Sequence, residues 1–424
     1  MNGLLRAGYE GAALLARALA ELAPGSGSKL LRTFAARRGV RARYAAFARQ
    51  HERSLLWMHA PSVGEGLQAR PVLELARTRI PDAQLAYTYF SPSAARFADS
   101  LDVDFRDVLP FDVTADARAA LDALTPTALV FSKLDVWPTL AREASARGVG
   151  LGLISATLAP ASSRLRGVAT ALLREAYARL DLVGAISADD AERLATLGVP
   201  AARISVTGDT RYDQVWARAA AADRDGPLLA ALRAPRFTLV AGSTWPADEG
   251  PLLKAWGRLH ARHADARLIL APHEPTEAHL APLERWAAGA GLRSVRLGAD
   301  GAEHAGVVIV DRVGVLGDLY ALADVAYVGG GFHSAGLHSV LEPAAFGAPV
   351  LFGPRHTNSR DASLLIARGG AASVRDAASV EASLATWIDD PSARRAAGDA
   401  ARDVVREGLG AAERSFALVA ALMR

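Results

Sequence analysis

Cysteine is absent from this sequence of 424 residues. The absence excludes disulfide frameworks, thiolate zinc sites and cysteine nucleophiles, and nothing in the chain requires an oxidising compartment. No segment has the pattern of a secretory signal peptide, so we expect the protein to stay in the cytoplasm. With 51% apolar and 22% charged residues and no low-complexity repeats, the composition is that of a folded globular protein.

Long apolar runs are also lacking. Residues 3–23 are rich in alanine and leucine, but charged side chains interrupt them at Arg6, Glu10, Arg17 and Glu21. A helix that spans a membrane needs ~20 predominantly apolar residues. We therefore interpret this segment as a helix that lies in the membrane interface.

A strong net charge is lacking too, since the formal value is only +3. We expect no nucleic-acid partner and look for partners in local clusters of charge instead. Residues 29–50 contain basic side chains and no acidic one: Lys29, Arg32, Arg37, Arg38, Arg41, Arg43 and Arg49. A basic, helical-looking segment of this kind suits an anionic membrane surface. The alternative, of equal weight, is an ordinary surface helix whose arginines are solvated.

Several catalytic signatures are missing. The sequence contains no GxxxxGK[ST] loop, no HExxH helix and no GxSxG elbow. His333 and His338 are five residues apart and lack a third ligand, so we predict no metal site.

Short apolar runs that alternate with longer amphipathic segments predict the fold. Fully apolar strands between helices are typical of a parallel sheet covered on both faces. The first series of runs comprises 55–60, 85–90, 128–133, 150–155 and 182–187, and the second comprises 237–243, 266–272, 306–311, 325–331 and 348–354. We predict an α/β protein with two doubly wound, Rossmann-like domains that face each other across a cleft.

The predicted boundaries follow from these series and from Gly-Pro breaks. Residues 1–50 form a basic helical segment, 51–210 the first domain, 211–236 a linker, 237–391 the second domain and 392–424 a closing helical segment. The closing segment is expected to return to the first domain.

Ligands of open α/β sheets bind at the carboxyl ends of strands, where this sequence places unusual residues. In GGGFHSAGLHSVLEP (329–343), glycines such as Gly330 and Gly331 let backbone amides approach a phosphate. A helix predicted to begin near His338 carries Glu342, whose carboxylate suits the hydroxyls of a ribose. The alternative is tight loop packing with a solvated Glu342.

Two other strand ends of the second domain are candidates. We expect Ser243 or Thr244 to cap the next helix. Two interpretations remain open: the capped helix start binds a phosphate, or the residue is a cap and nothing more. His273 follows a third strand, in APHEP (271–275). In the first domain, HAPSVGEG (59–66) places Glu65 at a helix start, where partial desolvation is expected to raise its pKa toward that of a general base. The alternative is that Glu65 only interacts with the positive end of the helix dipole. The spacing of the motif does not decide between this role and that of a general base.

As a set these motifs, with FSKLDVWP (131–138) and the segment 186–213, resemble the 3-deoxy-D-manno-octulosonic acid (Kdo) transferases over residues 57–375. The resemblance implies a GT-B fold and an inverting transfer of Kdo from CMP-Kdo to a lipid A precursor, lipid IVA, in lipopolysaccharide synthesis. It also implies a peripheral location on the cytoplasmic side of the inner membrane and no metal or other cofactor.

The resemblance also implies roles for individual residues. Glu65 matches the general base, and Arg211 falls where most members have a lysine that stabilises the transition state. The matched CMP-contacting residues are Pro272, His273, Val313, Gly314, Val315, Ser339, Val340, Leu341 and Glu342.

This chain departs from the family pattern at two positions. Lys133 replaces a glutamate, with Asp135 at the second acidic position, and Ser339 replaces an asparagine. A lysine at 133 reverses the local charge, yet it is able to neutralise a phosphate. Two other hypotheses remain open: a GT-B transferase or epimerase with a different nucleotide sugar, and a nucleotide-sugar-binding membrane protein that has lost catalysis through Lys133. Retention of Glu65 and Arg211 argues against the second.

Overall fold

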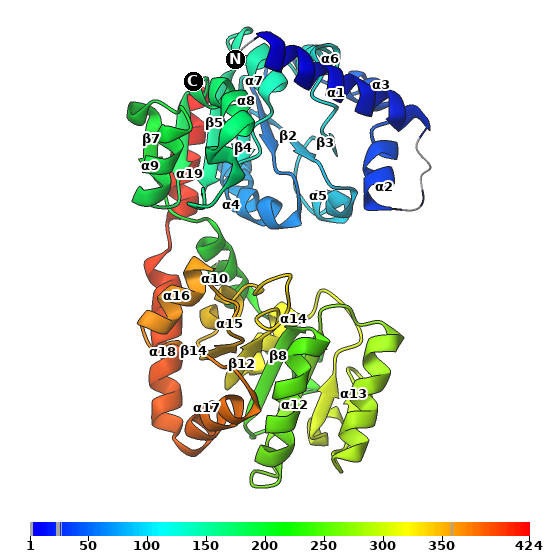
Figure 1. Ribbon diagram of the computed structural model, residues 1–424, viewed down its shortest axis with the longest axis vertical. Coiled ribbons are helices and arrows are strands. Elements are labelled where there is room, and N and C mark those ends of the chain that lie inside the picture. The colour runs from blue at the N-terminus through cyan, green and yellow to red at the C-terminus, as the bar shows by residue number, and fades with distance from the viewer. Residues whose placement is uncertain (1–2, 23–25, 27, 358) are drawn as a thin grey trace. The chain divides into compact units, whose positions relative to one another are not determined.

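The computed structural model describes residues 3–22, 26, 28–357 and 359–424 (Figure 1). The chain forms two compact units, each with helices packed on a parallel sheet. The first unit contains Met1–Gln214 and Leu409–Arg424, and the second contains Val215–Gly408.

The sheet of the first unit has seven parallel strands in the order β3-β2-β1-β4-β5-β6-β7. Its strands are β1 (Leu55–His59), β2 (Gln84–Tyr89), β3 (Phe105–Val108), β4 (Ala128–Ser132), β5 (Gly150–Ala156), β6 (Leu182–Ala185) and β7 (Ile204–Val206). Residues of β1 alternate between two apolar cores, with Trp57 in one and Met58 in the other. Both faces of the sheet are therefore buried, as fully apolar strands require.

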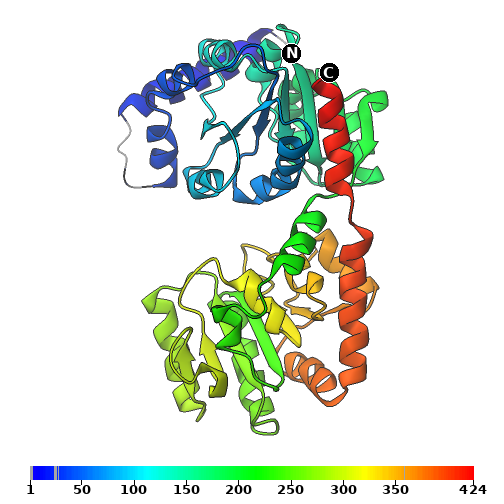
Figure 2. The ribbon, with the colours of Figure 1, turned by 180° about the vertical axis from the view of Figure 1, so that it is seen from behind.

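The helices of the first unit cover both faces of this sheet. They are α1 (Gly3–Leu22), α2 (Lys29–Ala35), α3 (Val40–Ala45), α4 (Val63–Arg79), α5 (Ala95–Asp99), α6 (Thr114–Leu124), α7 (Pro138–Ser145), α8 (Gly167–Ala178), α9 (Ala188–Thr196) and the closing α19 (Ala411–Leu422). Figure 2 shows α19, in red, against the strands of this unit. Gly152 on β5 permits this approach, because a Cβ there would lie 2.8 Å from a methyl group of Leu422.

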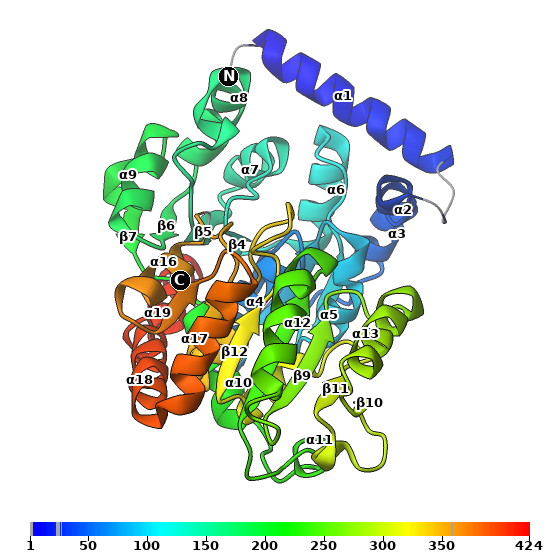
Figure 3. The same ribbon diagram turned by 60° about the horizontal axis from the view of Figure 1, so that its bottom comes forward.

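The second unit repeats the plan in the order β10-β11-β9-β8-β12-β13-β14. Its strands are β8 (Thr238–Thr244), β9 (Arg267–Pro272), β10 (Ser294–Arg296), β11 (Val307–Ile309), β12 (Val325–Val328), β13 (Val350–Phe352) and β14 (Ala371–Ser373). Its helices are α11 (Pro227–Ala230), α12 (Pro246–His260), α13 (Glu277–Gly289), α14 (Leu316–Leu319), α15 (Leu341–Ala345), α16 (Arg360–Ala367), α17 (Ala377–Asp389) and α18 (Pro391–Glu407), and α10 (Arg211–Ala221) runs across the boundary between the units. Figure 3 shows α12 and α17 side by side.

The predicted α/β class and the two doubly wound sheets are confirmed, and each of the ten predicted apolar runs overlaps a strand. The sequence prediction missed four strands, β3, β7, β10 and β14. These are the two edge strands of each sheet. An edge strand has a neighbour on one side only, and these four are three or four residues long, so none needs a long apolar run.

The basic segment 29–50 differs from the single helix that its sequence predicts. Gly39, in the left-handed region at φ 63°, separates α2 from α3. Many of its arginines contact their own chain. Arg43 forms a two-point ion pair with Asp107, and Arg41 pairs with Asp116. Arg37 is only 3% exposed and lies over the ring of Phe90.

These contacts leave less positive charge for a membrane than the sequence predicts. Arg38 and Arg49 also donate to backbone carbonyls, of Ala20 and Leu124 respectively. Lys29 and Arg32 remain exposed. The arginines therefore act largely as intramolecular hydrogen-bond donors.

Candidate functional site

The order of strands in each sheet reverses at one point. In the first sheet this switch lies between β1 and β4, and in the second between β8 and β12. A crevice opens at the carboxyl ends of strands at such a point, and it is the usual ligand site of open α/β sheets. Of the sequence-predicted residues, Glu65 and Lys133 follow β1 and β4, Ser243 lies in the last two residues of β8, and Gly330 follows β12.

Glu65 and Lys133 form an ion pair. Nζ of Lys133 lies 3.1 Å from Oε1 of Glu65, in the first turn of α4, and the Ser62 hydroxyl donates to the other carboxylate oxygen. Lys133 has a left-handed backbone with φ 67°, a conformation that a side chain beyond glycine rarely adopts. Its backbone N–H donates to Ile154 on β5, which holds the loop after β4 in this shape.

The expected rise in the pKa of Glu65 is wrong. Burial by itself raises the pKa of this carboxyl, but the Ser62 hydrogen bond and the charge and hydrogen bond of Lys133 outweigh it and hold the pKa below its usual value. Glu65 is therefore ionised over a wider pH range than an isolated glutamate.

Asp135 lies at the end of a second polar chain at the same strand ends. The indole of Trp57 donates to the hydroxyl of Thr88, which lies 3.0 Å from Nδ1 of the fully buried His59. Nε2 of His59 is 3.1 Å from Asp135, which also accepts from Trp137. Burial raises the pKa of Asp135, but the hydrogen bond and charge of His59 prevail and lower it.

Arg211 begins α10, and its guanidinium is held by Asp209. Nε and a terminal nitrogen of Arg211 lie 2.9 and 2.6 Å from the same carboxylate oxygen. The other oxygen of Asp209 accepts from the backbone of Arg211 and from Gln68 on α4. Asp209 is buried and Arg211 is partly exposed, so the guanidinium is fixed in direction while one side faces solvent.

Asp248 holds the glycine loop of the second unit. This carboxylate is fully buried and accepts from the backbone N–H groups of Gly330 (2.8 Å), Phe332 (3.0 Å) and Trp245 (3.0 Å). Gly330 has φ 91°, and a Cβ on it would lie 2.1 Å from a carbonyl oxygen, that of Gly336. The sequence offered no signal for Asp248 beyond its place in the first turn of a helix.

The cap of α12 and the start of α15 differ from their predictions. Trp245, rather than Ser243 or Thr244, stands at the N-cap of α12. Thr244 instead donates its hydroxyl to Glu249. The helix that carries Glu342 begins at Leu341, not near His338, because the residues between follow the glycine loop.

Glu342 lies near an ion pair formed by Arg218 and Asp318. Burial raises the pKa of Glu342, the nearby Arg218 opposes this rise and Asp318 adds to it. Arg218 lies 3.5 Å from Asp318. The three residues before Glu342 differ in exposure. Ser339 is exposed, whereas Val340 and Leu341 are buried.

The remaining predicted residues also lie at strand ends of the second sheet. Pro272 ends β9 and His273 follows it, exposed. Val313 and Gly314 follow β11; Val313 is 75% exposed, and Val315 caps α14.

A cluster of aromatic rings that the sequence analysis missed surrounds His273. The Trp245 ring stacks on His273 and His333, with centroids 4.5 and 4.2 Å apart, and His273 stacks on His338 at 4.6 Å. Nε1 of Trp245 donates to Nε2 of His338 over 3.2 Å. Three histidines and a tryptophan from three strand ends thus meet in one place.

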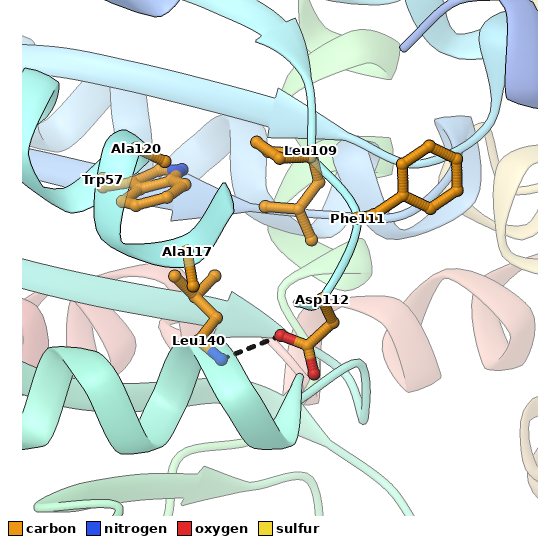
Figure 4. A pocket seen from close by; sticks show the side chains of 8 residues that line it. Trp57, Leu109, Phe111, Asp112, Ala117, Ala120 and Leu140 are labelled. Carbon is orange, nitrogen blue, oxygen red and sulfur yellow. Dashed lines mark hydrogen bonds between the residues drawn. The ribbon is translucent and has the colours of Figure 1, made fainter. Parts of the chain in front are cut away.

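A cavity of about 10 Å³ lies elsewhere in the first unit, beside Asp112 (Figure 4). Its lining includes Trp57, Leu109 and Leu140, and its volume is about that of one water-sized probe. Asp112 is buried and accepts from the backbone of Thr139 and Leu140 and from Tyr9 of α1. This cavity serves packing, and it is too small for a nucleotide.

Among the residues that the structure describes, no group of three or more histidine and carboxylate side chains is arranged to hold a metal ion. Within the same ranges, no helix has both the length and the apolar character that crossing a bilayer requires.

Solved structures with a similar fold include an epimerase and a glycosyltransferase by name. A putative UDP-N-acetylglucosamine 2-epimerase from Listeria monocytogenes has a TM-score of 0.63 at 13% identity, over 87% of this chain and 95% of that one. A glycosyltransferase from Rickettsia africae has a TM-score of 0.59 at 10% identity, over 88% and 98%. At these identities the likeness concerns the fold alone, which is the GT-B architecture.

Sequence comparisons go further than the fold. A family model described as 3-deoxy-D-manno-octulosonic-acid transferase (kdotransferase) matches residues 37–214. The 3-deoxy-D-manno-octulosonic acid transferase of Bordetella pertussis is 31% identical over 375 residues, which cover 85% of this chain and 86% of that protein. The transferase of the same name from Haemophilus influenzae is 26% identical over 86% of both chains. This chain belongs to the 3-deoxy-D-manno-octulosonic acid transferase family.

Proposed function

We propose that this protein transfers Kdo from CMP-Kdo to a lipid A precursor such as lipid IVA, with inversion at the anomeric carbon and without a metal. The observation that carries the proposal is an ionised glutamate, Glu65, held by Ser62 and Lys133 at the switch point of the first sheet. In this proposal Glu65 is the general base.

The reaction is one displacement. The acceptor hydroxyl attacks the anomeric carbon of Kdo, the bond from that carbon to the phosphate oxygen of CMP breaks, and the phosphate leaves with the electron pair. Glu65 takes the proton of the attacking hydroxyl. Arg211 balances the charge that develops on the phosphate, since Asp209 already fixes the direction of its guanidinium.

The donor site is proposed at the switch point of the second sheet. Asp248 accepts the N–H groups of Gly330 and Phe332 and so holds the glycine loop in shape. The N–H of Gly331 and the side chain of Ser243 supply donors to the phosphate. Glu342 accepts from the ribose hydroxyls. The residues after β9 and β11, namely Pro272, His273, Val313, Gly314 and Val315, complete the contacts with CMP.

Lys133 has a double effect in this proposal. It keeps Glu65 ionised, and it also lowers the basicity of that carboxylate. An acceptor phosphate that attracts Lys133 would release Glu65 for proton transfer. The lysine is therefore compatible with catalysis, and the reversed charge at position 133 suits an anionic acceptor. Asp135, fixed by His59 and Trp137, is the second carboxylate at this site.

A lipid acceptor requires contact with a membrane, and α1 offers a suitable surface. Tyr9 and Glu10 bind one face of α1 to Asp112 and Thr114. The apolar side chains on the exposed part of α1 are Leu4 (82%), Leu14 (47%), Leu15 (62%) and Leu19 (49%). We propose that this face enters the lipid interface of the inner membrane on its cytoplasmic side, with Lys29 and Arg32 adding attraction to anionic lipids.

The first test is transfer itself. Purified protein incubated with CMP-Kdo and lipid IVA should give a lipid that is heavier by one or more Kdo residues, read by mass spectrometry, which also counts the residues added. Glu65→Gln keeps the size of the side chain but cannot accept the proton, so kcat should fall by roughly 10²-fold or more while CMP affinity stays unchanged.

Glu74→Gln is the matched control, because Glu74 is an exposed glutamate on the same helix α4. It should retain the parent rate. A Glu65→Gln variant with a near-parent kcat would rule out Glu65 as the base and direct attention to Asp135.

The ion pair makes a second prediction, about pH. Lys133→Met removes the charge that lowers the pKa of Glu65 and leaves the burial that raises it, so this pKa should move upward. The acidic limb of the pH–rate profile should move to higher pH with it. A carboxyl ¹³C titration of Glu65 measures the same shift directly. Lys254→Met, an exposed lysine on α12, should cause none, and an unmoved Glu65 titration in Lys133→Met would contradict the assignment.

The third prediction concerns α1. Leu15→Gln with Leu19→Gln should weaken co-sedimentation with lipid vesicles by roughly tenfold for each leucine, because apolar burial supplies the binding. Most of the parent's binding should survive 0.5 M salt. Leu364→Gln, which changes an exposed leucine of α16 in the second unit, is the control. Loss of parent binding in salt, with no effect of the leucine changes, would show that the basic residues dominate.

A further inference from the structure

The aromatic cluster at the strand ends of the second unit has a feature that ring stacking alone does not explain. Its members are Trp245, His273, His333 and His338, and they come from the ends of β8, β9 and β12. His338 stacks on His273 and accepts a hydrogen bond from another member of the cluster, through the indole of Trp245. The chemistry of that one bond restricts the state of His338.

An indole N–H only donates hydrogen bonds. Nε2 of His338, 3.2 Å from Nε1 of Trp245, must therefore be the acceptor and carry no proton. A neutral imidazole with a bare Nε2 carries its proton on Nδ1. Trp245 thus selects one of the three states open to a histidine, namely the neutral form with an Nδ1–H.

His333 is restricted in the same way by a different group. Its Nδ1 accepts from the backbone N–H of Ala335 over 3.1 Å, so a neutral His333 carries its proton on Nε2. His273 stacks on both Trp245 and His338 and is exposed. The hydrogen bonds thus fix which ring nitrogen carries the proton in a neutral His338 and in a neutral His333.

The charged and titratable groups around His338 agree with a neutral ring. Burial lowers the pKa of His338, and His273 and His333 lower it further. Asp248 on α12 acts in the opposite direction, but it is already engaged by three backbone N–H groups. The backbone of His338 is fixed as well, since its N–H donates to the carbonyl of Gly329.

For a ligand, the important result is that His338 carries its proton on Nδ1. Within the described part of the chain, the bond from Trp245 is the hydrogen bond of this ring, no residue accepts from Nδ1, and the side chain is only partly buried. It is a neutral donor placed beside the glycine loop and next to the exposed ring of His273.

We propose that Trp245 is a positioning residue of the donor site, which holds His338 in the tautomer that presents Nδ1–H to an oxygen of the bound nucleotide. This inference rests on the proposed function, because the nucleotide is the ligand that the donor site takes. Trp245 acts through His338 and through the stacking of the imidazoles.

Trp245→Phe tests the proposal, since phenylalanine keeps an aromatic ring for stacking and loses the N–H. Without that donor, His338 should revert to the tautomer with the proton on Nε2, which imidazole prefers in water. Two-dimensional ¹⁵N–¹H spectra of the full-length protein distinguish protonated from bare ring nitrogens without any ligand. The parent should show a protonated Nδ1 and a bare Nε2, and the variant the reverse.

The affinity for CMP, measured by calorimetry, supplies a second readout with a distinctive pH dependence. At pH 8 the variant should bind CMP about 3- to 10-fold more weakly than the parent, the effect of one hydrogen bond. This ratio should move toward one only as the pH falls through the lowered pKa of His338, because a protonated His338 carries a proton on Nδ1 whatever residue stands at 245. The parent at each pH corrects for the titration of CMP itself.

Trp256→Phe is the matched control. Trp256 lies on the same helix α12, is fully buried, and has an indole nitrogen without a hydrogen-bond partner in the described chain. Its replacement should change neither the ring-nitrogen signals of His338 nor the pH dependence of the affinity ratio, even where it lowers stability.

Each outcome decides the proposal. An unchanged His338 tautomer in Trp245→Phe would overturn it, and so would a changed tautomer with parent-like CMP affinity at pH 8. A parent protein that binds no CMP and transfers no Kdo would refute the proposed function and the ligand half of this inference together. The spectra of the free protein would then still show whether Trp245 sets the tautomer.

Discussion

The carboxylate of Asp248 is fully buried, and its three hydrogen bonds join elements that are far apart in the sequence. It receives the backbone N–H of Trp245 at the start of α12 and those of Gly330 and Phe332 in the loop after β12. A buried carboxylate without such donors would be very costly, and a loop of glycines without such an acceptor would have no single shape. The proposed donor site depends on these three hydrogen bonds to Asp248.

The first unit uses the same principle with charged side chains. Glu65 is held by Ser62 and Lys133, Asp135 by His59 and Trp137, and Arg211 by Asp209. Each of these groups has its direction fixed by a neighbour before any substrate arrives. Such preorganisation is how a protein site stabilises developing charge without reorganising during the reaction. Lys133 belongs to this arrangement, because its partner is Glu65 itself.

The central strands were predictable, and the edges were not. A strand such as β4 is buried on both faces and has neighbours on both sides, so its sequence ALVFS must be apolar throughout. β3 reads FRDV and β10 reads SVR, because an edge strand tolerates polar side chains. The carboxyl ends of the central strands also indicated where the candidate residues lie, since parallel strands bring those ends together.

What the sequence did not indicate depends on partners that are distant along the chain. Lys133, which together with Ser62 lowers the pKa of Glu65, lies 68 positions later in the chain. The partners of Arg41 and Arg43, Asp116 and Asp107, lie outside the window 29–50 of the sequence. Trp245, His273 and His338 meet only when β8, β9 and β12 are neighbours in one sheet. The composition of a short stretch of sequence carries no information on contacts with residues that are distant along the chain.

The central claim is that a Kdo transferase of this family binds its donor nucleotide at the switch point of the second sheet. Amide chemical shifts of the full-length protein, recorded as CMP is added, test it most directly. We predict the largest changes in 242–245, 272–273, 313–315 and 329–342, with no comparable change in 59–66. Changes confined to the first unit, or no change at saturating CMP, would contradict the account.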